Sequence, residues 1–166
     1  RDLRDRTSRY ARDRLGLYAR RGLGWEVLPE RDPATRALRA EDVARFVAGE
    51  EPEWDDSEAS FLKPGQLPSS EAEWIDLGRR VFFEYPLRIE QTYTALARLE
   101  GGLEDSGFLL EGDEWVGLRL LLDGTGQPTV GNTCAQCHAG RNPDGTVTGS
   151  LANRAMDVGA ARLLVQ

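Results

Sequence analysis

Cys134-Ala135-Gln136-Cys137-His138 holds both cysteines and the single histidine of a chain of 166 residues. Two residues separate the cysteines, so one helical turn presents both thiols on the same side. The histidine follows the second cysteine directly, which puts its imidazole beside the two sulfurs. This Cys-x-x-Cys-His spacing is the attachment pattern of a c-type haem.

The chemistry of haem attachment explains the spacing. Two thiols add across the vinyl groups at one edge of the porphyrin and form thioethers, and the adjacent imidazole binds the iron as proximal ligand. The sequence therefore predicts one covalent haem c held by Cys134, Cys137 and His138.

Other sites built from cysteine and histidine fit the chain less well. A structural zinc site needs about four Cys or His ligands, and this chain has two Cys and one His. A thioredoxin-like redox pair needs a βαβ setting, which the pattern around the motif does not indicate. A disulfide between the two cysteines leaves the adjacent histidine unexplained.

The sequence leaves several candidates for the second axial ligand of the iron. Two histidine ligands are excluded within a chain that has one histidine. Met156, the only methionine, lies eighteen residues after His138. A thioether ligand would raise the reduction potential and favour one-electron transfer. Core packing on a terminal helix explains Met156 equally well. An open or water-occupied position, a ligand from a partner chain and one from beyond Gln166 are further alternatives.

Arg141 and Arg154 are predicted to pair with the haem propionates. Both follow the motif closely in the sequence, and a guanidinium binds a carboxylate through two parallel hydrogen bonds. Ordinary solvation at the surface is the alternative for both side chains.

Hydrophobic spacing and capping signals predict mostly helices. Ser70 with Glu73 three residues later is a capping box. The apolar run 115–122, followed by the turn signal Asp123-Gly124, predicts a small β-hairpin that returns through 128–131. A polar loop is expected after His138. Helices are predicted over 2–21, 40–48, 70–85, 89–99 and 150–165.

Charge is distributed unevenly along the chain. Residues 1–21 hold eight Arg and three Asp, which gives +5, so the other residues sum to −12 within the net charge of −7. Residues 50–58 hold six acidic residues and no basic one. Such segments are typical of docking surfaces, with solvated faces as the alternative. The acidic balance argues against nucleic-acid binding, and no apolar run approaches the ~20 residues that span a bilayer.

Three further stretches, together with the haem motif, resemble the cytochrome c superfamily. Leu77-Gly78-Arg79-Arg80-Val81-Phe82 is similar to its N-terminal helix. Thr148-Gly149-Ser150-Leu151 is similar to the Gly-Pro-x-Leu stretch after the motif, with Ser150 in place of Pro. The run from Gly149 to Asn153 resembles the di-haem peroxidase-like branch. The resemblance covers roughly residues 71–166, and about fifty residues separate the first helix from the motif, more than in a small soluble cytochrome c.

The resemblance implies a mainly α, cytochrome c-like haem domain, with the small hairpin and an N-terminal helical extension added. We assign residues 1–70 to that extension, which is a possible docking segment, and 71–166 to the haem-binding domain. The implied function is one-electron transfer rather than catalysis, so no residue is assigned as catalytic. The expected partners are a redox protein or other subunits of an electron-transfer complex, in the periplasm or another extracytoplasmic compartment of a bacterium.

Two alternative functions stay open. One is a peroxidase-like haem enzyme or ligand-binding domain with an open sixth coordination position. The other is a haem-bearing structural subunit of a larger assembly.

Overall fold

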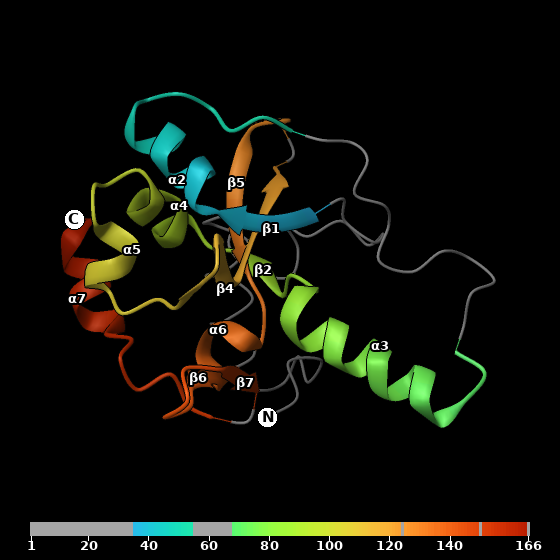
Figure 1. The fold of residues 1–166 in the computed structure, drawn as a ribbon. Coiled ribbons are helices and arrows are strands. Elements are labelled where there is room, and N and C mark those ends of the chain that lie inside the picture. Colours follow the sequence, from blue (N-terminus) through green and yellow to red (C-terminus); the bar gives the residue numbers. More distant parts are fainter. Residues whose placement is uncertain (1–34, 55–67, 124, 150, 166) are drawn as a thin grey trace, which may run out of the picture.

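The computed structural model describes residues 35–54, 68–123, 125–149 and 151–165. Helices hold 38% of these residues and strands hold 25%, in two antiparallel sheets. The prediction of a mainly α protein is therefore wrong, because the described part of the chain is mixed α/β (Figure 1).

The elements follow one another along the chain as short helices and strands. Their bounds are β1 Thr35–Arg39, α2 Ala40–Val47, α3 Glu71–Glu84, β2 Arg88–Ile89, α4 Gln91–Ala97, α5 Gly102–Asp105, β3 Leu110–Glu111, β4 Glu114–Leu122, β5 Pro128–Asn132, α6 Ala135–His138, β6 Ala139–Arg141, β7 Val147–Gly149 and α7 Val158–Leu164.

The main sheet is built on the predicted hairpin. Its order is β1-β4-β5-β2, and β3 pairs with β4 outside this path. The hairpin of β4 and β5 is confirmed, with a register that runs from Leu122 opposite Pro128 to Leu118 opposite Asn132. The Asp123 carboxylate closes the turn by accepting hydrogen bonds from the Thr125 amide and hydroxyl and from the Gln127 amide. These hydrogen bonds lower the pKa of Asp123, and the bond from the Thr125 hydroxyl has the largest effect.

β1 joins the N-terminal part of the chain to this sheet. It runs antiparallel to β4, with Thr35 opposite Leu121. α2 follows β1 directly and confirms the helix predicted over 40–48. Residues 35–54, which we assigned to the N-terminal extension, thus share a sheet and a core with the residues after 68.

The hydrophobic core lies between the main sheet and the helices α2, α4, α5 and α7 (Figure 1). Its largest fully buried side chains are leucines and one phenylalanine, and burying each contributes roughly 1.5–3 kcal/mol. The cluster consists of Leu38, Val43, Phe46, Tyr93, Leu96, Ala97, Leu103, Phe108, Trp115, Leu118, Leu120, Val130 and Ala161. Neither α3 nor α6 contributes a residue to it.

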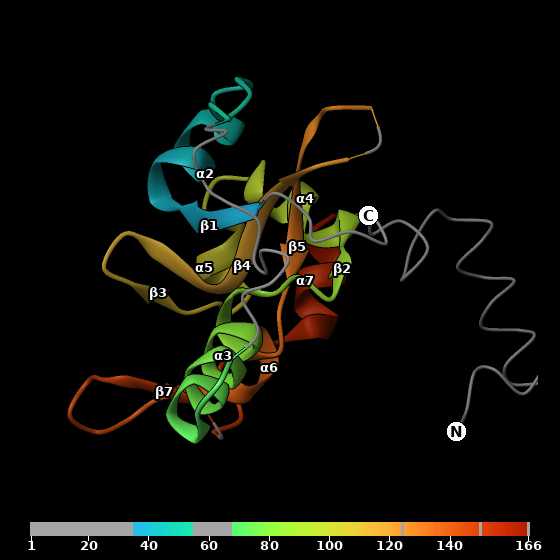
Figure 2. The same ribbon diagram turned by 90° about the vertical axis from the view of Figure 1, so that its right-hand side faces the viewer.

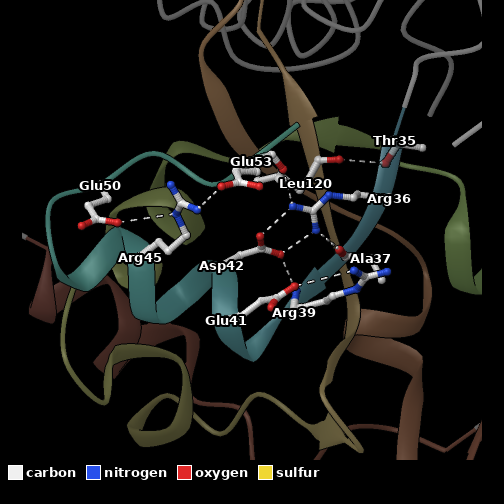
Figure 3. Close-up of polar contacts among 10 residues, drawn as sticks. All are labelled: Thr35, Arg36, Ala37, Arg39, Glu41, Asp42, Arg45, Glu50, Glu53 and Leu120. Atoms are coloured by element: carbon white, nitrogen blue, oxygen red, sulfur yellow. Dashed lines mark hydrogen bonds and ion pairs between the residues drawn. The ribbon is translucent and has the colours of Figure 1, made fainter. Parts of the chain in front are cut away.

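A buried ion pair fixes the corner between β1 and α2. Arg36 donates to both carboxylate oxygens of Asp42, at 2.6 and 2.7 Å, and to the Glu53 carbonyl at 2.8 Å (Figure 3). The side chains of Arg36 and Asp42 are only 5% and 3% exposed. Asp42 also accepts the backbone N–H of Arg39, which caps α2. Removing one partner of such a pair leaves a buried charge without a counter-charge and lowers the stability of the fold by about 3–5 kcal/mol.

The described acidic residues that follow α2 pair with arginines of the same chain. Glu53 and Glu50 lie 2.8 and 3.7 Å from the guanidinium of Arg45, and Glu51 lies 3.0 Å from that of Arg98. These three carboxylates therefore have internal partners. The rest of the acidic segment and the basic helix predicted over 2–21 lie outside the described residues.

Several helix bounds differ from the prediction. The helix predicted over 89–99 is α4, followed after a glycine turn by α5. The polar loop expected after His138 is the β6–β7 hairpin. The predicted terminal helix begins only at Val158. The residues before it are hydrogen-bonded to the turn after α5 instead; the Asp157 N–H, for example, donates to the Ser106 carbonyl at 3.1 Å.

No helix in the described part of the chain is long and apolar enough to cross a membrane.

Candidate functional site

The haem motif lies on α6, a single helical turn with two distinct faces. Ala135 and Gln136 are 1% and 2% exposed and point into the protein. Cys137 and His138 are exposed, and Cys134 is half-buried. Neither cysteine is part of a disulfide. The predicted helical turn at the motif is confirmed, and the disulfide alternative is absent.

Gly117 of β4 allows α6 to lie directly on the sheet. Its φ is +73°, and a Cβ there would come 2.1 Å from Gln136 N and 2.5 Å from Gln136 Cα. The Gly117 carbonyl accepts the Thr133 N–H at 2.9 Å, just before the motif. Only glycine permits this conformation together with this close approach.

The Gln136 side chain ties the inner face of α6 to the core. Its Oε1 accepts hydrogen bonds from the Tyr93 hydroxyl at 3.3 Å and the Cys137 thiol at 3.1 Å. Its Nε2 donates to Met156 Sδ. Both ends of this buried amide are thus satisfied, which fixes the position of the turn that carries the cysteines.

The residues after the β6–β7 hairpin lie across the C-terminal end of α6. The Asn153 N–H donates to the Cys137 carbonyl at 3.1 Å, and Asn153 Nδ2 donates to the Gly107 carbonyl at 3.1 Å. A Cβ on Gly140 would come 2.8 Å from Leu151 Cβ. The motif is therefore held from below by β4 and from its C-terminal end by the 151–153 segment.

α3 lies beside α6 at the end that leads to β2 (Figures 1 and 2). Its apolar side chains are not part of the hydrophobic core of the described residues. None of its fourteen residues is buried. Trp74 is 54% exposed, Ile75 is 66% exposed and Val81 is 38% exposed. α3 therefore carries exposed apolar side chains on a helix that contacts α6.

A cavity of about 340 Å³ lies between α3 and β7. Phe82 contacts Gly149 here, since a Cβ on that glycine would come 3.1 Å from the phenylalanine ring. The lining is mostly apolar with one cationic side chain and one hydroxyl: Arg79, Phe82, Phe83, Thr148 and Gly149.

Arg141 and Arg154, predicted to bind propionates, line one larger cavity of about 470 Å³ with Leu151, Ala152 and Asn153. Arg141 donates to the Gly145 carbonyl at 2.6 Å and to the Leu110 carbonyl at 2.7 Å, which fastens the β6–β7 turn to β3. Arg154 is exposed. The structure brings the two arginines together, and their role toward a propionate stays a prediction.

Met156 is partly buried and packs against the hydrophobic core. It contacts Gln136, on the inner face of α6. Its role as an iron ligand also stays a prediction.

Gln136, Gly117 and Asn153 support the motif but were not predicted from the sequence. Gly117 carried a usable signal, because an isolated glycine inside a strand pattern marks a bulge or a close backbone approach. Asn153 belongs to the run that resembles the di-haem peroxidase-like branch, but its bonds to Cys137 and Gly107 were not predicted. Gln136 gave no signal, since its partners Tyr93 and Met156 lie far along the chain.

No group of three or more His, Cys, Asp or Glu side chains in the described ranges is arranged to hold a metal ion. Comparison with protein-family models, curated proteins and solved structures finds no match to this chain.

Proposed function

We propose that this chain is a c-type cytochrome domain with one haem bound through Cys134, Cys137 and His138, and that it exchanges single electrons with a partner protein. The observation that carries the proposal is the orientation of α6. Ala135 and Gln136 are buried, while Cys137 and His138 are exposed and Cys134 is half-buried; the Cys137 thiol donates to Gln136 Oε1 at 3.1 Å. In this proposal that hydrogen bond gives way to the thioether, and the three residues hold one porphyrin.

The surroundings of α6 suit a flat and mostly apolar cofactor. Covering the exposed apolar side chains of α3, such as Val81 and Trp74, would remove them from water. Exposed apolar patches of this kind typically mark binding sites. Arginines at the two neighbouring cavities are suited to the two propionates of a haem. The donor set and the surface chemistry thus fit the group.

Each residue of the motif has a defined role in this proposal. Cys134 and Cys137 would each hold the haem by a thioether, formed when the S–H bond adds across a vinyl double bond with no net oxidation. His138 would bind the iron through its imidazole. When bound, the haem supplies a ferrous–ferric couple that takes up or releases one electron.

The partner follows from the same chemistry. A carrier of single electrons needs a donor and an acceptor, so we propose a redox protein or neighbouring subunits of an electron-transfer complex. In line with the resemblance to cytochromes c, we propose that the protein works in an extracytoplasmic bacterial compartment.

Haem attachment is tested by expressing the chain in a bacterium with an active c-type maturation system. The mass of the denatured protein is expected to rise by one haem, and the pyridine haemochrome spectrum is expected to report two thioethers. Cys134→Ala or Cys137→Ala should shift that spectrum to one thioether, and the double variant should release its haem on denaturation. A known c-type cytochrome matured in the same cells is the positive control.

If that control is loaded while this chain keeps its unmodified mass, haem attachment is refuted. Electron exchange is tested on the loaded protein by voltammetry, where a reversible one-electron wave is expected. A loaded protein that gives no such wave and does not exchange electrons with small redox mediators would refute the carrier function.

A further inference from the structure

Gln136 carries a buried amide, and the chemistry of its partners fixes the direction in which that amide points. The residue is 2% exposed. Its Nε2 donates to Met156 Sδ, while its Oε1 accepts hydrogen bonds from the Tyr93 hydroxyl at 3.3 Å and from the Cys137 thiol at 3.1 Å. A thioether sulfur can only accept, whereas a hydroxyl and a thiol can both donate. The amide oxygen therefore faces the Cys137 thiol.

The backbone of α6 is held at both ends, so the Cys137 thiol stays beside this oxygen. At the start of the turn, the Ala135 N–H donates to Thr133 Oγ1 at 3.2 Å, and Ala135 is 1% exposed. At its end, the Asn153 N–H donates to the Cys137 carbonyl at 3.1 Å. The hydrogen bond between Cys137 and Gln136 thus belongs to a turn that packing and backbone bonds keep in place.

A disulfide between the two cysteines would remove this hydrogen bond. Oxidised glutathione, for example, takes two electrons and two protons from Cys134 and Cys137, so that one S–S bond forms between them while the S–S bond of glutathione breaks into two thiols. A disulfide sulfur has no hydrogen to donate. Gln136 Oε1 would then keep the Tyr93 hydroxyl and lose the thiol, and a buried acceptor that loses a donor raises the free energy of the product.

We infer that Gln136 is a positioning residue that biases Cys134 and Cys137 toward the dithiol and against the disulfide. The inference goes beyond the proposed function, because it uses only contacts within the haem-free chain and can fail without it. If the chain does bind haem, the bias keeps both sulfurs available, since a disulfide would consume them. A thioether removes the same hydrogen bond, but other thiols do not exchange its carbon–sulfur bond, so the bias acts on the reversible competitor.

The test compares two variants of the haem-free protein that remove different partners of this hydrogen-bond group. Tyr93→Phe removes the hydroxyl and leaves the thiol as donor to Oε1. Tyr93→Phe with Gln136→Leu removes the acceptor as well, so neither polar partner of the pair remains. Each protein is equilibrated at one fixed pH with mixtures of reduced and oxidised glutathione, quenched with acid and alkylated. Mass spectrometry then counts the thiols, which all belong to the motif because the chain has two cysteines.

The two variants are expected to shift in opposite directions from the wild type. Tyr93→Phe should favour the dithiol, because the disulfide would then take the remaining donor from a buried oxygen. The double variant should form the disulfide more readily than Tyr93→Phe by about threefold or more, as expected for one hydrogen bond from a weak donor. A merely structural role would loosen the turn in both variants and move both equilibria in the same direction.

Equal equilibrium constants for the two variants, or a double variant that forms the disulfide less readily than Tyr93→Phe, would overturn the inference. Circular dichroism verifies that both variants are folded. If the double variant is unfolded, the wild type decides the question by NMR. The side-chain amide resonances of Gln136 are expected to shift when the dithiol is oxidised to the disulfide, and resonances that stay unchanged would show that Gln136 does not sense the thiol.

Discussion

α4 and α3 are both amphipathic helices, but they use their apolar residues differently. α4 buries Tyr93, Leu96 and Ala97 among its seven residues, and Tyr93 stacks edge-on against Phe108 at 5.1 Å. α3 is twice as long and buries no residue. Its apolar side chains include Trp74 and Ile75, each more than half exposed.

The difference separates residues that build the core from exposed apolar residues that we propose a bound haem covers. α4 packs on the core because the sheet, α5 and α7 surround it. α3 is stabilised by its cap and by limited contacts to β4 and α6. An amphipathic helix normally buries its apolar stripe, so the exposed apolar side chains of α3 support the proposal that a bound haem covers part of this helix.

The largest expected effect comes from a matched pair of truncations in these two helices. Leu96 is fully buried, so Leu96→Ala should lower the free energy of unfolding by about 2–5 kcal/mol. Ile75 is 66% exposed, so Ile75→Ala should lower it by less than about 0.5 kcal/mol in the haem-free protein. Urea unfolding followed by tryptophan fluorescence measures both. A cost above 1.5 kcal/mol for Ile75→Ala would show that α3 belongs to the folded core.

Local signals predicted the parts of the fold that depend on neighbouring residues in the sequence. The capping box of Ser70 and Glu73 is formed as predicted, and the hairpin after Trp115 turns at Asp123. The motif forms a helical turn that presents both thiols. In each case the decisive bonds connect residues only a few positions apart.

Long-range contacts explain what was not predicted. β1 was not predicted because its buried Arg36 interrupts the hydrophobic pattern of the strand. Burial of Arg36 depends on its ion pair with Asp42, which comes from the following helix α2. The terminal helix is shorter than predicted because tertiary hydrogen bonds hold residues 153–157 against the turn at Gly107. The mainly α prediction was wrong because β1, β2, β3, β6 and β7 are strands of two to five residues, too short for hydrophobic spacing to indicate them.

Removing the N-terminal cap of α3 is expected to have the second largest effect, a local loss of helix stability. Ser70 Oγ accepts the Glu73 N–H at 3.3 Å. Ser70→Ala should destabilise α3 by about 1 kcal/mol, and because α3 is outside the core the loss should be local. Hydrogen exchange is expected to speed up by about fivefold at the amides of α3 and to stay unchanged at those of α4. Ser70→Thr, which keeps the hydroxyl, is the control, and equal acceleration in both helices would contradict this separation.

Acid should loosen α3 before it loosens α4, and this is the smallest expected effect. The pKa of Glu73 is lowered from about 4.5, first by the backbone N–H of Ser69, then by the Ser69 hydroxyl and the Ser70 N–H. A carboxyl whose pKa is lowered by folding stabilises the folded state above its unfolded-state pKa. That stabilisation is lost as the pH falls through the lower, folded-state pKa.

The first turn of α3 should therefore fray in acid. Backbone chemical shifts of residues 71–75, followed by NMR from pH 6 down to about 3, are expected to move toward coil values before those of α4 change. Glu73→Gln cannot titrate and should remove this early step without changing the later unfolding. If wild type and Glu73→Gln follow the same curve at residues 71–75, the Glu73 carboxylate does not hold the start of α3, and the contrast between the two helices has another cause.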